Sequence, residues 1–180
     1  ERPMINTPPA QKIIFTELTE YLAEVDEEKQ TAIRTRIADY NNLAQKPDPA
    51  TGQPVFAKNC APCHSIKGTG GAIGPQLDGV GRWGVEPLIE KILDPNRNIA
   101  ENFRSYTVKL KDGKILSGLY RRDEGQVIVF ADVSGQEFQV SKQDIAERTA
   151  SKFSLMPDQF RNTIPANEFN SLISYLLSQK

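Results

Sequence analysis

The segment Cys60-Ala61-Pro62-Cys63-His64 contains both cysteines and the single histidine of this 180-residue chain. Two cysteines separated by two residues would close a very small loop, so a disulfide between them would restrict the unfolded chain little. A disulfide framework is therefore not expected. The gathering of every thiol and imidazole in one turn indicates a single chemical centre, and the rest of the fold has to position that turn.

The spacing C-x-x-C-H is the attachment signature of c-type haem. Two thiols can add to the two vinyl groups on one edge of a porphyrin, and two intervening residues let one helical turn present both sulfurs to that edge. The following residue then directs its imidazole at the iron. We therefore predict that Cys60 and Cys63 carry one covalent haem c and that His64 is the proximal ligand.

Two other centres use similar residues. A redox dithiol has the same C-x-x-C spacing, but it is typical of a βαβ context that this sequence lacks, and it leaves His64 without a role. A structural zinc site needs four ligands. Because the chain has only three cysteine and histidine side chains, a carboxylate would have to complete a zinc site. Haem is the preferred interpretation.

A haem bound through His64 needs a sixth ligand. A second histidine is excluded within this chain, and methionine is the usual alternative, which raises the reduction potential. Met4 lies in a Pro-rich N-terminal tail, whereas Met156 precedes Pro157 in a loop before the last helix. We predict Met156 as the distal ligand. The alternatives are a core methionine, an open iron site and a lysine ligand.

The chain divides into a helical extension and a longer unit. Apolar residues recur at helical spacing over residues 11–45, which predicts one long helix or a helical hairpin. A Pro-rich break follows, so we place a tail and helical extension at 1–46 and a second unit at 47–180.

Apolar residues make up 38% of the chain and its net charge is −1, so no preference for nucleic acid is indicated. No apolar run of about 18 residues codes a membrane span.

The second unit is predicted to be mainly helical with an inserted sheet, an α+β fold. A helix capped by Thr51 leads into the motif, and further helices cover 85–93 and 167–179. Between about 103 and 149 the apolar period changes to two. This change predicts an antiparallel meander of about four strands, with a two-residue turn at Asp112-Gly113.

The end of this insertion is predicted differently. Ser141 followed by Asp144 suggests a helix cap, so residues 141–148 are expected to form a helical turn.

Taken in order, these segments resemble a class I cytochrome c: a helix entering C-x-x-C-H, then Gly74-Pro75-Gln76-Leu77, a late Met-Pro and a terminal amphipathic helix. Four segments resemble more narrowly the haem-binding domain of large planctomycete and verrucomicrobial proteins: VFAKNCAPCHSIKGTGGAIGPQLDGVG, EKILDPNRNIAENF, KDGKILSGL and SLMPDQF. The resemblance covers about residues 52–180. His64 and Met156 lie farther apart than in a minimal class I cytochrome, and the strand insertion accounts for the excess.

The resemblance implies further roles. Pro75 would accept a hydrogen bond from the free ring N–H of His64. Arg82 and Trp83 would reach a haem propionate, against the alternatives of a solvated arginine and a core tryptophan. Packing roles at the crossing of the first and last helices of the haem domain are implied for Gly52, Phe56 and Tyr175.

The implied function is a monohaem domain, not an enzyme, that carries single electrons between redox partner proteins or fused redox domains. The alternatives are a five-coordinate haem that senses a small ligand or reacts with peroxide, and a protein-interaction module with a structural haem. The inserted sheet would cover one haem edge or dock a partner. Lys58, Lys67 and Arg82 would form a weakly basic rim that steers an acidic partner. Because c-type haem is attached outside the cytoplasmic membrane in such bacteria, a periplasmic or otherwise exported location is expected.

Overall fold

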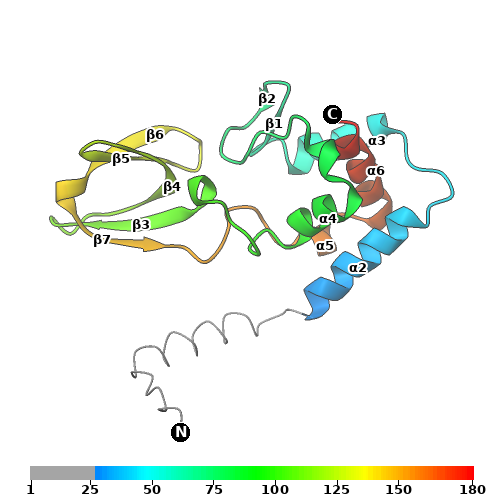
Figure 1. Cartoon of the computed structure of the whole chain (residues 1–180), viewed down its shortest axis with the longest axis horizontal. Helices are drawn as coiled ribbons and strands as arrows, with labels where there is room; N and C mark the ends of the chain where they lie inside the picture. The colour runs from blue at the N-terminus through cyan, green and yellow to red at the C-terminus, as the bar shows by residue number, and fades with distance from the viewer. Residues whose placement is uncertain (1–26) are drawn as a thin grey trace, which may run out of the picture.

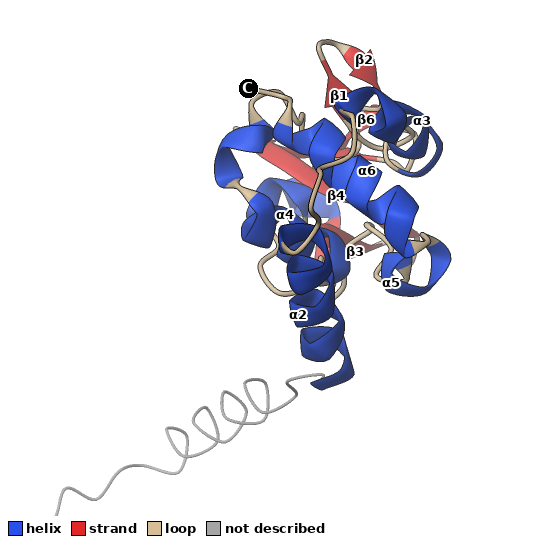
Figure 2. Ribbon diagram, turned by 90° about the vertical axis from the view of Figure 1, so that its right-hand side faces the viewer, coloured by secondary structure: helices blue, strands red, loops and turns tan. Residues whose placement is uncertain are grey.

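The structure is a computed structural model that describes residues 27–180. Figure 1 shows two lobes, with the helices gathered at one end of the molecule and an antiparallel sheet at the other. In the end-on view of Figure 2 the helices lie in front of the strands. The Pro-rich tail, Met4 and the helix predicted over residues 11–26 lie outside the described residues.

The helical lobe contains five α-helices of the described chain and a short hairpin. The helices are α2 (Glu27–Asn41), α3 (Pro49–Asn59), α4 (Val85–Leu93), α5 (Phe160–Thr163) and α6 (Ala166–Leu177). The hairpin strands are β1 (Ser65–Ile66) and β2 (Thr69–Gly70), and a 3-10 turn, η1 (Val80–Trp83), belongs to the same lobe. A second 3-10 turn, η2 (Glu101–Phe103), lies against the sheet. The helices predicted over 85–93 and 167–179 are confirmed, with α6 ending at Leu177.

Helix α2 confirms the helix predicted for the described part of residues 11–45, and it packs on the other helices. Its Ile33 and Tyr40 are buried in the helical core, and the Tyr40 hydroxyl lies 3.0 Å from Ser174 Oγ on α6. Arg36 donates to the carbonyls of Arg161 and Ile164 at 3.2 and 3.0 Å. These contacts hold α2 against α6 and the segment around α5.

Helix α3 begins three residues earlier than predicted. The Asp48 carboxylate accepts a hydrogen bond from the Ala50 N–H at 2.9 Å, so Asp48 rather than Thr51 is the N-cap. Pro49 occupies the first helical position, where a residue without an N–H costs nothing and its φ already suits a helix. The capping prediction at Thr51 was wrong, because the Asp-Pro pair supplies a better start.

Helices α3 and α6 cross at very close range. A Cβ atom at Gly52 would lie 2.0 Å from the carbonyl oxygen of Ser171, which leaves room only for glycine. One turn farther along α3, the rings of Phe56 and Tyr175 pack with centroids 5.4 Å apart. The three residues implied by the resemblance therefore meet at this crossing, which holds the end of α3 in place.

The second lobe is a five-stranded antiparallel sheet in the order β6-β5-β4-β3-β7. Its strands are β3 (Ser105–Leu110), β4 (Ile115–Glu124), β5 (Val127–Ala131), β6 (Glu137–Ser141) and β7 (Ile145–Ala150). The turn after β3 is longer than the predicted two residues, because the Leu110 N–H donates to the Lys114 carbonyl at 2.8 Å and leaves residues 111–113 between them. Gly113 has φ +90° in this turn, a conformation that glycine adopts without strain.

Strand β7 corrects the helical turn predicted over residues 141–148. Only Lys142–Asp144 form a turn, the 3-10 helix η3, and Ser141 makes no capping hydrogen bond with its side chain. Ile145–Ala150 instead pairs with β3. The edge of β3 that β4 leaves open offers backbone hydrogen-bond partners for a full strand, and this outweighs a weak capping signal.

Two apolar clusters build the sheet lobe and join it to the helices. Tyr106, Val108 and Phe130 belong to the buried cluster of the sheet itself. A smaller cluster contains Ile73, from the loop after the hairpin, with Leu119 of β4 and Ala131 of β5. The described residues thus form a mixed helical and antiparallel β fold, and none of their helices is long and apolar enough to cross a membrane.

We predict that Gly52→Ala destabilises the protein by about 1–3 kcal/mol, because the added methyl group overlaps backbone atoms of α6 that a rotamer change cannot move. Urea unfolding of the purified protein measures the change. Gln53→Ala, on the exposed side of the same helix, is the matched control and should stay within about 0.5 kcal/mol of the parent. Equal stability of the two variants would contradict the close crossing.

Candidate haem site

The C-x-x-C-H motif forms the turn that follows helix α3. The Cys60 N–H donates to the Phe56 carbonyl at 2.8 Å, so the helical path continues into the motif. The Cys60 carbonyl then accepts from the N–H groups of Cys63 and His64 at 3.0 and 2.9 Å. Both thiols and the imidazole are thereby held on one tight turn.

The two thiols are free, half-buried and differently surrounded. Cys60 packs against the helical core, whereas Cys63 packs against the cluster of Ile73, Leu119 and Ala131. Burial, followed by the charge of Cys63, raises the pKa of the Cys60 thiol to about 12. A reactive redox dithiol needs the opposite shift, so these surroundings do not favour the dithiol alternative.

The imidazole of His64 is held by the glycine-proline segment of the sequence. Its Nδ1 lies 2.8 Å from the carbonyl oxygen of Pro75, and a carbonyl can only accept, so Nδ1 carries the proton. A Cβ atom at Gly74 would lie 2.6 Å from His64 Cε1, which means that the ring rests on the glycine backbone. Burial lowers the pKa of His64 and the hydrogen bond to Pro75 raises it, with burial the larger cause. The neutral ring therefore presents an unprotonated Nε2.

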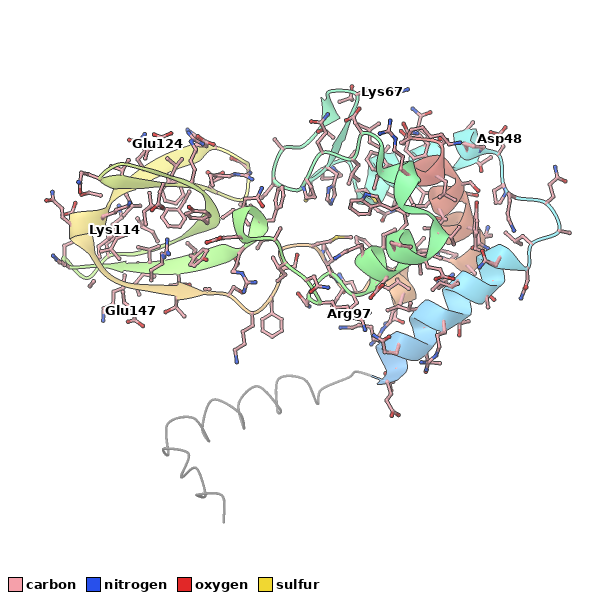
Figure 3. All side chains as sticks on the ribbon, in the orientation of Figure 1. Asp48, Lys67, Arg97, Lys114, Glu124 and Glu147 are labelled. Atoms are coloured by element: carbon pink, nitrogen blue, oxygen red, sulfur yellow. The ribbon has the colours of Figure 1, made fainter. Side chains whose placement is uncertain are left out.

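The glycine-rich segment after the motif folds back over it. The Gly71 N–H donates to the Ala61 carbonyl at 2.8 Å, and the Gly74 N–H donates to the Cys63 carbonyl at 2.7 Å. A Cβ atom at Gly71 would lie 2.1 Å from the Pro62 carbonyl oxygen. Figure 3 shows Lys67 at the outer end of the β1–β2 hairpin in this segment. The return of the chain is what brings Pro75 to His64.

Met156 lies in the loop between β7 and α5 and is half-buried. It packs against the helical core, which Cys60 and Leu77 also contact. The Met156 N–H donates to Ser154 Oγ at 3.1 Å. The structure thus brings Met156 to the core that borders the motif; its coordination of iron stays a prediction.

Arg82 and Trp83 lie on η1, which is pinned to the end of α6 by a hydrogen bond from the Gly81 N–H to the Gln179 carbonyl at 2.9 Å. Arg82 is exposed, and Trp83 is 53% exposed, so Trp83 is not a core tryptophan. Within the described residues, neither side chain forms a hydrogen bond with the motif. Their contact with a propionate stays a prediction.

Three long-range contacts were missed by sequence reasoning. The Arg121 guanidinium on β4 donates to the Ala72 carbonyl at 2.9 Å, which ties the sheet to the loop after the motif. Asn96 accepts a hydrogen bond from the N–H of Ser154, two residues before Met156. Leu119 belongs to the apolar cluster against which Cys63 packs. Each joins segments far apart in the sequence, and no local pattern marks them.

Two cavities of the described structure lie away from His64. One of about 640 Å³ is formed by α2 and the region of α5, and one of about 500 Å³ is lined by Asn96, Arg97, Asn98, Ile99, Ala100, Arg104 and Lys152. Among residues 27–180, no group of three or more histidine, cysteine, aspartate or glutamate side chains is placed to hold a metal ion. A zinc site completed by a carboxylate therefore has no support there.

The Cytochrome c family model matches residues 49–147, which include the C-x-x-C-H motif, the glycine-proline segment and most of the sheet. The match ends before Met156. No protein of curated function matches the sequence.

The residues of the site fit a covalent haem. Two thiols and one imidazole share a turn, and the His64 ring rests on Gly74 with Nδ1 bonded to Pro75, so Nε2 is the nitrogen that remains for a metal. With the family model covering more than half of the chain, these features place the protein in the cytochrome c family as a c-type cytochrome that binds haem c.

Proposed function

We propose that residues 47–180 form a monohaem electron-transfer domain, and that the chain carries single electrons rather than catalysing a reaction. Cys60 and Cys63 would form the thioether bonds, His64 would be the proximal ligand and Met156 the distal ligand. The observation that carries this proposal is the fixed, neutral His64, whose Nδ1 is bonded to the Pro75 carbonyl at 2.8 Å. The haem supplies an iron that alternates between ferric and ferrous states.

The protein would hold His64 and Met156 in place as ligands and limit solvent at the site. The Pro75 carbonyl sets the plane of the His64 ring and raises its basicity as a ligand. Cys60 is surrounded by the helical core and Cys63 by the smaller cluster of Ile73, Leu119 and Ala131. Apolar surroundings of this kind lower the dielectric near the iron and limit solvent rearrangement when its charge changes.

Met156 is supported as the distal ligand by its surroundings. It is the single methionine of the described residues, and it packs on the same helical core as Cys60. Its loop emerges from β7, so the sheet lobe takes part in its placement. A thioether ligand favours the ferrous state and so raises the potential.

The sheet lobe is proposed to cover one edge of the haem. Leu119 and Ala131 pack in the cluster that contacts Cys63, and Arg121 is bonded to the Ala72 carbonyl. Such an insertion is characteristic of the planctomycete and verrucomicrobial haem-binding domain, which we propose as the subtype.

Partner and location follow from the same proposal. Lys58, Lys67 and Arg82 are exposed near the motif, and such a rim would steer an acidic redox partner or fused domain. Covalent attachment of c-type haem implies maturation outside the cytoplasm, so the chain is proposed to be periplasmic or otherwise exported.

The proposal is tested first by attachment. Protein matured with a cytochrome c assembly system should exceed its polypeptide mass by one haem and give a c-type pyridine haemochrome spectrum. Replacing both Cys60 and Cys63 by alanine should abolish the covalent haem, while Ser65→Ala, just beyond the motif, should retain it. Colourless parent protein of polypeptide mass would refute the proposal.

Met156→Ala should convert low-spin haem to a high-spin form that binds carbon monoxide readily in the reduced state. Its potential should fall by at least about 60 mV, the value of a tenfold change for one electron, because the ligand that favours ferrous iron is lost. Leu155→Ala, at the 46% exposed neighbour, is the control. If the parent haem is already high-spin and binds carbon monoxide readily in the reduced state, the five-coordinate sensor or peroxidase alternative is favoured instead.

Gly74→Ala should shift the potential in the opposite direction. The added methyl group displaces the His64 ring and weakens its bond to Pro75, so the ring donates less to ferric iron. We expect a rise on the order of 60 mV for a tenfold change in relative ferric affinity, measured by redox titration. Gln76→Ala, exposed in the same loop, should leave the potential unchanged. A Gly74→Ala potential equal to that of the parent would argue against His64 as the ligand.

A further inference from the structure

Asn96 connects the loop after α4 to the loop that contains Met156. Its Oδ1 accepts a hydrogen bond from the Ser154 N–H at 2.7 Å, in a partly buried position, across 58 residues of sequence. Because a backbone N–H needs an acceptor, the amide oxygen of Asn96 is the atom that faces Ser154. Ser154 Oγ in turn accepts from the Met156 N–H at 3.1 Å. Two consecutive hydrogen bonds thus lead from Asn96 to the backbone of Met156.

The loop that carries Asn96 is itself well anchored. Arg97 pairs with Glu90 of α4, and Asp94 lies 3.5 Å from the Lys29 ammonium of α2. The Asp94 N–H also donates to the Glu90 carbonyl at 2.8 Å, which ends α4. Figure 3 shows the Arg97 region where the two lobes meet. Asn96 therefore projects from a segment fixed to two helices.

The Met156 loop has few other polar attachments. Its start is held by the Ser151 N–H, which donates to the Ser105 carbonyl of β3 at 2.8 Å. Within the described chain, the bond to Asn96 is the hydrogen bond that ties residues 152–158 to a segment outside the loop. Without it, the backbone before Met156 would be held only by the sheet at Ser151 and by apolar packing.

We propose that Asn96 is a positioning residue for Met156. By holding the loop, it sets how strongly the Met156 side chain competes with other ligands for the distal position of the iron. The proposal rests on the proposed function, in which Met156 is the distal ligand. A thioether is a weak ligand, so its occupancy depends on a loop that keeps it near the iron. Loss of the Asn96 acceptor leaves the Ser154 N–H unsatisfied in the observed loop conformation, which disfavours that conformation.

The test measures imidazole binding to the ferric haem-loaded protein, in competition with Met156. Imidazole binds only after Met156 leaves, so its apparent affinity reports the fraction of the open form. Asn96→Leu removes the acceptor at similar size, and we expect imidazole to bind about tenfold more tightly. Asn96→Asp retains an acceptor oxygen, and its affinity should stay within about threefold of the parent. The sulfur-to-iron charge-transfer band of the ferric protein should weaken only in Asn96→Leu.

Two controls separate positioning from general destabilisation. Asn98→Leu changes an exposed neighbour in the same loop and cavity, and Val140→Ala lowers stability in the buried cluster of the sheet, on β6 at the edge opposite β7. Both should bind imidazole like the parent. If either binds it as tightly as Asn96→Leu, the effect is not specific and the proposal is overturned.

The outcome also distinguishes this proposal from the ligand assignment. If Met156→Ala tightens imidazole binding but Asn96→Leu does not, Met156 is the ligand and the role of Asn96 is refuted. If Met156→Ala itself leaves binding and spectrum unchanged, the ligand assignment has failed. Ser154→Ala removes the hydrogen bond between the Met156 N–H and Ser154 Oγ without altering Asn96, and it should tighten imidazole binding by about threefold. If Asn96→Leu does not yield haem-loaded protein, Ser154→Ala provides the test instead. An imidazole affinity of Ser154→Ala equal to that of the parent would then count against the proposal.

Discussion

The contact between α3 and α6 at Gly52 is the constraint on which the helical lobe depends. A missing side chain lets one backbone approach another, with an ideal Cβ position only 2.0 Å from the Ser171 carbonyl oxygen. Phe56 and Tyr175 then close the same interface from the side. Because the cysteine motif follows α3 without a break in the hydrogen-bonded path, the depth of this crossing sets where both thiols and the imidazole lie.

The glycine-rich segment completes the His64 side of the site because its glycines have no side chain to prevent close approach. Gly71 and Gly74 approach the backbone of the motif and the His64 ring more closely than any larger residue allows. The Pro75 carbonyl can only accept a hydrogen bond, so it selects the Nδ1–H form of the His64 imidazole. Burial favours the same neutral ring. Small residues thus determine both the place and the protonation state of His64.

The sheet lobe has its own core but is not an independent addition. Leu119 and Ala131 reach the surroundings of Cys63, and β7 delivers the chain to the Met156 loop. That loop leaves the sheet at Ser151 and meets Asn96 three residues later. The insertion between motif and methionine therefore belongs to the frame of the site, because both faces of the proposed haem position depend on where the sheet sits.

The sequence by itself determined the chemistry of the protein and most of its secondary structure. Five adjacent residues imply the haem, and sequence patterns predict α2, α3, α4 and α6, but not α5, together with four strands of the five-stranded sheet. Errors arose where weak local signals met stronger competitors: Asp48 replaced Thr51 as the cap, and β7 formed in place of a helical turn because β3 had an open edge.

Only the tertiary structure decided which distant groups meet. Nothing local to Asn96, Arg121 or Leu119 marks them, since Ser154, Ala72 and Cys63 lie 58, 49 and 56 residues away from them in the sequence. Likewise, exposure of Trp83 could not be read from its neighbours in the sequence. Periodicity reports which face of an element is buried, whereas hydrogen bonds across long loops depend on how whole elements pack.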